Sequence, residues 1–258
     1  MVEGGVDTAS DRPVYKQIAD LLRSAIERGD LGPGERLPSE TELMKRYGVA
    51  QGTVRQAVGL LRSEGVVVAE HGRGVFVRAR PRLRRLAHDR FARRHREAGK
   101  SAYDAEAEAE KVTALVDSIR VYPDKAKDEI ARRLGLRKGA KVLVRSRRYL
   151  SDGQPTETAT SYIPWDLAKG TPMVETNPGP GGIYARIEES GHRLGRFAEE
   201  VTARMPTPDE VTALRLAPGS PVIGLVRTAY DVDDLAVEVC DTVMSAELYV
   251  LSYELPAT

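Results

Sequence analysis

The sequence of 258 residues contains a single cysteine, Cys240, and no apolar stretch near the roughly 18 residues that a membrane-spanning helix needs. One cysteine excludes a disulfide within the chain and fits a reducing compartment. The first ten residues are partly acidic and lack the apolar run of a secretory signal. We therefore expect a cytoplasmic protein without a membrane partner.

The signatures of common enzymes and metal sites are missing as well. The sequence contains no nucleophile elbow, no Walker phosphate loop and no Cys/His metal set. His192 follows a glycine and is interpreted as a turn residue, and Cys240 lies in an apolar stretch and is interpreted as core. Asp231, Asp233 and Asp234 could bind a cation, but a polar turn explains them more simply. We expect no catalytic residue, metal or cofactor.

Charge is unevenly distributed along the chain. Residues 1–100 hold 20 Lys and Arg against 13 Asp and Glu, whereas residues 101–258 hold 19 against 25. A basic front half favours a polyanionic partner. Much of the excess lies in residues 82–100, so a chance fluctuation explains it equally well.

The front half has the pattern of three short helices. Apolar residues recur at helical spacing through residues 14–28. Ser39 with Glu42 makes a capping box that opens a second helix, and Gly48 is suited to end it in the left-handed conformation. A third helix is predicted over residues 52–63, polar on one side and apolar on the other. Its predicted buried residues are Val54, Ala57, Val58 and Leu61.

A short glycine-rich hairpin is predicted next. Val66-Val67-Val68 and Val75-Phe76-Val77 are candidate strands on either side of His71-Gly72-Arg73-Gly74.

These elements are suited to bind DNA. Two helices joined by a tight turn can place side chains in the major groove of DNA. A glycine-rich tip can approach a phosphate or the minor groove closely, while Arg73 supplies charge.

Residues 14–77 resemble the N-terminal winged helix-turn-helix domain of the GntR family of bacterial transcription regulators. The resemblance rests on Gly34-Glu35-Arg36-Leu37-Pro38-Ser39-Glu40, Tyr47-Gly48-Val49 and Thr53-Val54-Arg55-Gln56-Ala57. In that family the start of the third helix reads bases, the start of the second contacts DNA and the wing tip enters the minor groove. The implied DNA contacts are Ser39, Thr41, Gln51, Gly52, Thr53, Arg55, His71, Gly72 and Arg73.

Two of these positions depart from the family pattern. Members often have arginine at the position of Thr41, and Ser-Arg at that of Ala50-Gln51. Glutamine can bond adenine bidentately, whereas arginine favours guanine, so we expect an operator that differs from the common family site. Glu40 is interpreted as a partner of the helix dipole rather than as a base reader.

Residues 79–110 are interpreted as a basic linker that becomes partly helical or extended. Arginines crowd positions 78–96, and glutamates follow at 106, 108 and 110. The arginines could add salt-sensitive phosphate contacts, and a solvated linker is an equally good explanation.

The back half contains a weak internal repeat. Residues 128–149 and 209–229 align, with matched positions 80 residues apart from Leu134 and Leu214 onward. Each copy runs helix, glycine turn and strand. Thr207-Pro208-Asp209-Glu210 is a further capping box. Asp152-Gly153 and Asp233-Asp234 are predicted to turn each strand back into an antiparallel partner. The pattern predicts an α+β domain, with helices on one face of an antiparallel sheet.

Residues 111–254 resemble the UTRA effector-binding domain of the HutC subfamily of these regulators, whose fold is similar to that of chorismate lyase. The implied plan is a winged helix-turn-helix domain at residues 1–78, the linker at 79–110 and a UTRA domain at 111–258. In members that respond to sugar phosphates, arginines on the first matched strand hold phosphate, and acidic and tyrosine residues hold the sugar. The implied effector contacts are Arg145, Arg147, Tyr149, Ser161, Arg227, Glu238 and Met244.

Three substitutions relative to those members make the expected pocket more apolar. Tyr149 stands at a second arginine position, Ala159 at an acidic one and Met244 at a tyrosine one. A hydrophobic or partly anionic effector is therefore favoured over a sugar phosphate. Residues 177–182 could offer amides to an anion, but glycine and proline chiefly punctuate loops, so a plain surface loop is preferred.

Two arginines stand at matching positions of the repeat. Arg147 and Arg227 could together clamp an anionic ligand. They could equally form structural ion pairs with Glu157 or Glu238. Both interpretations remain open at this point.

Together these patterns predict a homodimeric, sequence-specific DNA-binding regulator, a repressor, whose operator affinity depends on a small-molecule effector. The alternatives are a DNA-binding regulator controlled by a partner protein and a chorismate-lyase-like enzyme. In the family the C-terminal sheets make the dimer contact, so the apolar strands between Val237 and Leu251 are candidates for it.

Overall fold

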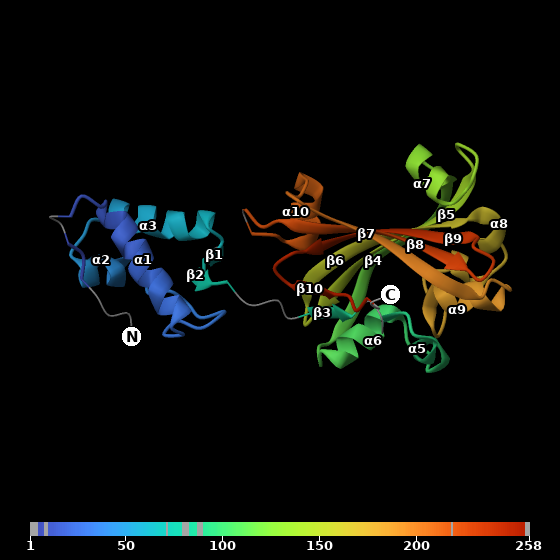
Figure 1. Cartoon of the computed structure of the whole chain (residues 1–258), viewed down its shortest axis with the longest axis horizontal. Helices are drawn as coiled ribbons and strands as arrows, with labels where there is room; N and C mark the ends of the chain where they lie inside the picture. Colours follow the sequence, from blue (N-terminus) through green and yellow to red (C-terminus); the bar gives the residue numbers. More distant parts are fainter. Residues whose placement is uncertain are drawn as a thin grey trace. The chain divides into compact units, whose positions relative to one another are not determined.

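The computed structural model describes residues 5–7, 10–70, 72–78, 83–86, 90–217 and 219–255. They form two compact units, one within residues 5–78 and the other comprising most of residues 83–255 (Figure 1). No helix in these ranges combines the length and the apolar content that a membrane crossing requires.

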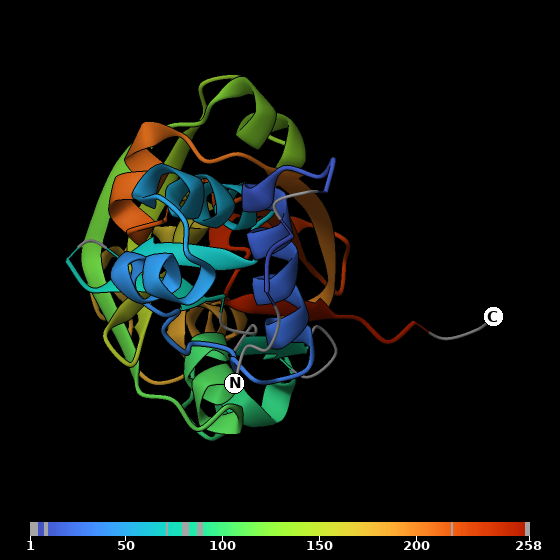
Figure 2. The same ribbon diagram turned by 90° about the vertical axis from the view of Figure 1, so that its left-hand side faces the viewer.

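Three helices and a hairpin make up the N-terminal unit (Figure 2). The three helices are α1 (Val14–Glu27), α2 (Glu40–Tyr47) and α3 (Gln51–Ser63). Each buries one apolar stripe in a common core, with Leu22, Leu43 and Leu61 almost fully shielded from water. The predicted capping box of Ser39 and Glu42 opens α2.

The predicted wing is confirmed. Strands β1 (Val67–Glu70) and β2 (Gly74–Val77) pair as an antiparallel hairpin. Val67 lies opposite Val77, and both side chains are buried in the core of the three helices. The hairpin is therefore fixed to the helices at its base.

The C-terminal unit is built on a six-stranded antiparallel sheet in the order β4-β5-β6-β9-β8-β7. The strands are β4 (Ala114–Lys125), β5 (Lys141–Ser151), β6 (Gln154–Pro164), β7 (Leu194–Arg204), β8 (Val222–Asp231) and β9 (Ala236–Ser245). A separate parallel pair joins β3 (Leu83–Leu86) to β10 (Tyr249–Ser252). The predicted α+β class is confirmed.

Helices cover both faces of the large sheet, not one face as predicted (Figure 1). On one face α7 (Asp128–Arg133) buries Ile130 against Val142 and Val144, and α10 (Pro208–Leu214) lies on the same side. On the other face Ile187 of α9 packs with Leu143. The second layer also contains α5 (Arg93–Glu97), α6 (Ala102–Ala109) and α8 (Trp165–Ala168).

The internal repeat is confirmed and is longer than the sequence indicated. The first copy runs β4, α7, β5 and β6, and the second runs β7, α10, β8 and β9. Read from either edge, the sheet has the same order of equivalent strands, and the copies meet where β6 pairs with β9. Equivalent side chains of β5 and β8 therefore point to the same face of the sheet.

One expectation needs correction. The described parts of the segment interpreted as a basic linker, residues 83–86 and 90–110, belong to the C-terminal unit and contain β3, α5 and α6. It folds there because the guanidinium groups of Arg85 and Arg90 are buried beside carboxylates. The dimer contact stays a prediction; β9, one of its candidate strands, is paired on both sides by β6 and β8, so it could contribute side chains but not backbone pairing.

Candidate functional site

The first turn of α3 presents polar side chains to solvent. Gln51, Gly52 and Arg55 are exposed and Thr53 is half-buried, whereas Val54 is fully buried in the core. The amphipathic pattern thus aims the predicted base readers away from the core.

The start of α2 lies beside this turn. Glu40, its first residue, accepts a hydrogen bond from Gln51 Nε2 at 2.7 Å and one from Arg55 Nε at 3.0 Å. The Ser39 hydroxyl donates to Glu42 at 2.7 Å and accepts from the Glu42 amide, so it is engaged in the helix cap. Thr41 is exposed.

The wing tip exposes a cation. Gly72 has φ 73°, and Arg73 is exposed, ion-paired with Glu70 and stacked on the Phe76 ring at 5.4 Å. His71, the remaining predicted contact, lies outside the described residues.

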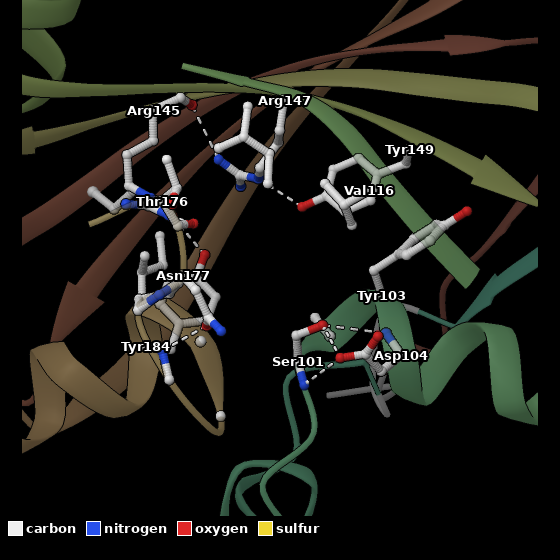
Figure 3. A pocket seen from close by; sticks show the side chains of 18 of the residues that line it. Ser101, Tyr103, Asp104, Val116, Arg145, Arg147, Tyr149, Thr176, Asn177 and Tyr184 are labelled. Atoms are coloured by element: carbon white, nitrogen blue, oxygen red, sulfur yellow. Dashed lines mark hydrogen bonds between the residues drawn. The ribbon is translucent and has the colours of Figure 1, made fainter. Parts of the chain in front are cut away.

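A pocket of about 400 Å³ opens on the sheet face that carries α6 and α9. Its roof is the sheet, and its sides are the start of α6 and the loop that leads into α9 (Figure 3). Five of the predicted effector residues line it, namely Arg145, Arg147, Tyr149, Arg227 and Glu238. Other lining residues are Arg90, Ser101, Tyr103, Asp104, Val116, Ile119, Thr176, Asn177 and Tyr184.

Arg145 holds the loop at the pocket rim. Its guanidinium donates to the backbone carbonyls of Met173 and Glu175, and to that of Thr176 at 3.0 Å. Burial and the charge of Arg147 lower the pKa of Arg145 to about 10, so it stays cationic at neutral pH. Arg145 therefore contributes positive charge to the pocket, while most of its hydrogen bonds hold the backbone of the adjacent loop.

Arg147 is the cation best placed to meet a ligand. It donates from Nε to the Tyr149 hydroxyl at 2.6 Å (Figure 3). A terminal nitrogen donates to Ser161 Oγ at 3.0 Å. None of the described carboxylates forms an ion pair with it. Ser161 is fully buried behind Arg147 and is not in the lining, so it positions the arginine rather than the ligand.

Arg227 takes part in a buried polar cluster. Its Nε donates to the Tyr184 hydroxyl at 2.9 Å, its terminal nitrogens lie 3.8 Å from Glu199 and 3.9 Å from Glu238, and it stacks on Phe91 at 4.5 Å. Burial raises the pKa of Tyr184 well above its ordinary value, so its hydroxyl donates to Glu238 at 2.5 Å. Of the two open interpretations, the ion pair describes Arg227, and an accessible cation describes Arg147.

Met244, another predicted effector residue, is not in the pocket. It is fully buried, and its sulfur accepts from Arg85 at 2.9 Å. Met244 lies on the pocket face of β9, but the β3–β10 pair covers that end of the sheet, and Tyr249 of β10 packs in the same cluster.

Sequence reasoning missed both sides of the pocket. The loop at residues 177–182, interpreted as a plain surface loop, lines it together with the start of α9 (Gly182–Glu189). Arg90, which falls in the expected linker, contacts Glu106 and lies 3.9 Å from Glu157. A usable signal was present at Ser101-Ala102-Tyr103-Asp104, which forms a capping box at α6.

Family models match the sequences of both units. A family model described as "Bacterial regulatory proteins, gntR family" matches residues 14–77, and the UTRA domain model matches residues 111–250. An uncharacterized HTH-type transcriptional regulator of Streptomyces coelicolor is 33% identical, over 95% of this chain and 94% of its own length. The HTH-type transcriptional repressor NagR of Bacillus subtilis is 27% identical, over 95% of each chain.

A solved structure gives the same result. The crystal structure of PhnF from Mycobacterium smegmatis has a TM-score of 0.59 at 25% identity, covering 95% of this chain and all of that one. The predicted pair of domains is confirmed, and so is the expectation of a DNA-binding regulator rather than an enzyme, because the named relatives are transcriptional regulators.

Proposed function

Because the chain belongs to the GntR family of bacterial regulatory proteins and carries a UTRA domain, we propose that it is a homodimeric repressor whose operator affinity changes when a small organic anion binds in the C-terminal unit. The observation that carries this proposal is the charge of the pocket. Four arginines line it, whereas its carboxylates, Asp104 and Glu238, are engaged in a helix cap and in the Arg227 cluster.

The proposed ligand has an anionic end and an apolar body. Arg147 lines the pocket from the sheet, and the N-terminus of α9, the positive end of its helix dipole, lines it from one side. Tyr103 and Tyr149, with ring centres 4.4 Å apart, border another part together with Val116. A compact phosphate or carboxylate attached to an aliphatic or aromatic group fits this division of charge.

A hydrogen-bond donor on the ligand would be favoured as well. Glu238 is fully buried, and its Oε1 forms no hydrogen bond with any described group. A buried acceptor without a partner is costly, and a ligand hydroxyl or ammonium group would remove that cost.

The proposed DNA contacts come from residues 1–78. Gln51 and Arg55, at the start of α3, would bind base edges, and Arg73 would contact the minor groove or the DNA backbone. Their exposure and their position on helix and wing support this assignment. The full proposed set is Ser39, Thr41, Gln51, Gly52, Thr53, Arg55, His71, Gly72 and Arg73.

We propose repression from the names of two relatives, and dimerisation from the symmetry of the DNA sites that helix-turn-helix proteins bind. NagR of Bacillus subtilis and PhnF of Mycolicibacterium smegmatis are named transcriptional repressors. Helix-turn-helix proteins commonly bind two half-sites as symmetric dimers. A repressor acts on chromosomal DNA, so we place its action in the cytoplasm.

Thermal unfolding of the full chain with a ligand panel tests the effector class. The panel contains sugar phosphates, aliphatic and aromatic carboxylates and neutral sugars. A ligand at 100 times its Kd stabilises the folded chain by about 2.7 kcal/mol. We expect anions with an apolar group to raise the Tm of the parent and of Arg196→Ala, an exposed control, but not that of Arg147→Ala.

Operator affinity is then measured by footprinting and fluorescence anisotropy on DNA upstream of the gene, with and without each stabilising ligand. A change in affinity supports effector control. Equal stabilisation by neutral sugars contradicts the proposed ligand class. Unchanged operator affinity across the whole panel contradicts effector control and favours control by a partner protein.

A further inference from the structure

Glu40 joins the two helices of the DNA-reading motif. It is the first residue of α2, and both oxygens of its carboxylate face α3. Gln51 donates to it at 2.7 Å, and Arg55 donates from Nε at 3.0 and 3.1 Å. Gln51 and Arg55 are four residues apart, so they are neighbours on one side of α3. A single carboxylate thus engages two of the proposed base readers.

The charge of Glu40 is stable at neutral pH. Hydrogen bonds from Gln51 and then from Arg55 lower the pKa of Glu40 below its ordinary value. An ionised carboxylate is an acceptor only. The nitrogen of the Gln51 amide must therefore face Glu40, and its oxygen must face away.

This orientation has a consequence for base recognition. Adenine is read by an amide whose oxygen accepts from N6 and whose nitrogen donates to N7. Glu40 occupies one N–H of Gln51 and leaves its oxygen and second N–H available for that pair. In the same way Arg55 uses Nε toward Glu40, which leaves its two terminal nitrogens for guanine or a phosphate.

We infer that Glu40 is a positioning residue that sets the base preference of α3, and this inference rests on the proposed DNA contacts of Gln51 and Arg55. Arg55 is 63% exposed, so without a partner its side chain would sample many rotamers. Ordering it in the groove would then oppose binding. The carboxylate also repels phosphates, so it disfavours binding to duplexes in which Gln51 and Arg55 can form no hydrogen bond with a base.

The test uses full-length Glu40→Gln, with Glu27→Gln as a control that makes the same charge change on an exposed position of α1. The preferred site of the parent is first selected from a randomised duplex library. Affinities for that site and for a scrambled duplex are then measured by fluorescence anisotropy. We expect Glu40→Gln to lower the ratio of specific to scrambled affinity about tenfold per half-site. Glu27→Gln should leave the ratio unchanged.

The library selection is repeated for Glu40→Gln and for Gln51→Ala. We expect the preference to relax at the same base pair in both variants. A fall in Tm with an unchanged base preference would show a structural role only and would overturn the inference.

A double-mutant cycle separates this inference from the contacts on which it rests. Combining Glu40→Gln with Gln51→Ala and Arg55→Ala should add no further loss of specificity, because the residues act through one another. If Gln51→Ala and Arg55→Ala leave specificity intact, the proposed contacts fail. If they reduce it and Glu40→Gln does not, the contacts stand and the positioning role fails.

Discussion

The buried pair of Arg227 and Glu238 offers a sharp test of how the pocket is stabilised. Arg227 is 4% exposed and Glu238 is fully buried, with 3.9 Å between their charged atoms. Arg227→Met removes the cation and leaves the carboxylate with the Tyr184 hydroxyl as its hydrogen-bond donor. Removing one member of a buried pair costs about 3–5 kcal/mol, because the other charge is left uncompensated.

Thermal unfolding of the C-terminal unit measures this cost. For a unit of this size, we expect Arg227→Met to lower the Tm by about 6–20 °C. The matched control is Arg196→Met, since Arg196 is half exposed and pairs with Asp234 at 2.6 Å on the surface. Arg196→Met should lower the Tm far less than Arg227→Met, because water screens the surface ion pair and the stacking of Arg196 on Tyr230.

The double variant Arg227→Met with Glu238→Met removes both charges and should recover much of the stability lost in the single variant. If the free energy of unfolding of Arg227→Met lies within about 1 kcal/mol of that of the parent, the two charges do not compensate each other. The same conclusion follows if the double variant loses the sum of two large single effects.

Three further outcomes are expected. Arg55→Ala should weaken specific operator binding about 5- to 150-fold per half-site with an unchanged Tm, and equal binding in anisotropy assays would remove Arg55 from the contacts. The hydrogen bond from Arg148 lowers the pKa of Asp117, so the stabilisation from this carboxylate is present above about pH 4 and is lost as the pH falls further. In urea titrations Asp117→Asn should cost less than about 1 kcal/mol at pH 7, and the cost should shrink as the pH is lowered below about 4. Gly181→Ala should cost about 1–3 kcal/mol in the same assay, because φ is 76° and the new Cβ would lie 2.8 Å from Ala185 Cβ.

The elements that were predicted from the sequence are those set by short-range patterns. The capping boxes at Ser39 and Thr207 depend on a residue three positions away, so the sequence displays them directly. The apolar stripe of α3 and the strands of the wing follow local periodicity. The repeat was visible because α7–β5 and α10–β8 each keep helix, turn and strand in the same spacing.

The features that were missed depend on contacts between residues far apart in the chain. Arg85 and Arg90 resemble linker residues in composition, and the buried carboxylate that lies beside both guanidinium groups, that of Glu157, is more than sixty positions later. Met244 lies on the expected face of its strand, but the β3–β10 pair covers that end of the sheet. The loop at residues 177–182 borders the pocket because Arg145 binds the carbonyls of Glu175 and Thr176 directly before it, and no local pattern reveals such a bond.

The chain contributes to the wall of the pocket soon after it leaves the wing. The polypeptide that leaves the wing at Val77 already supplies Arg90 to the ligand cavity, and Ser101 caps a helix at the same cavity. A ligand that binds in this cavity would therefore contact the stretch of sequence that directly follows the DNA-reading unit.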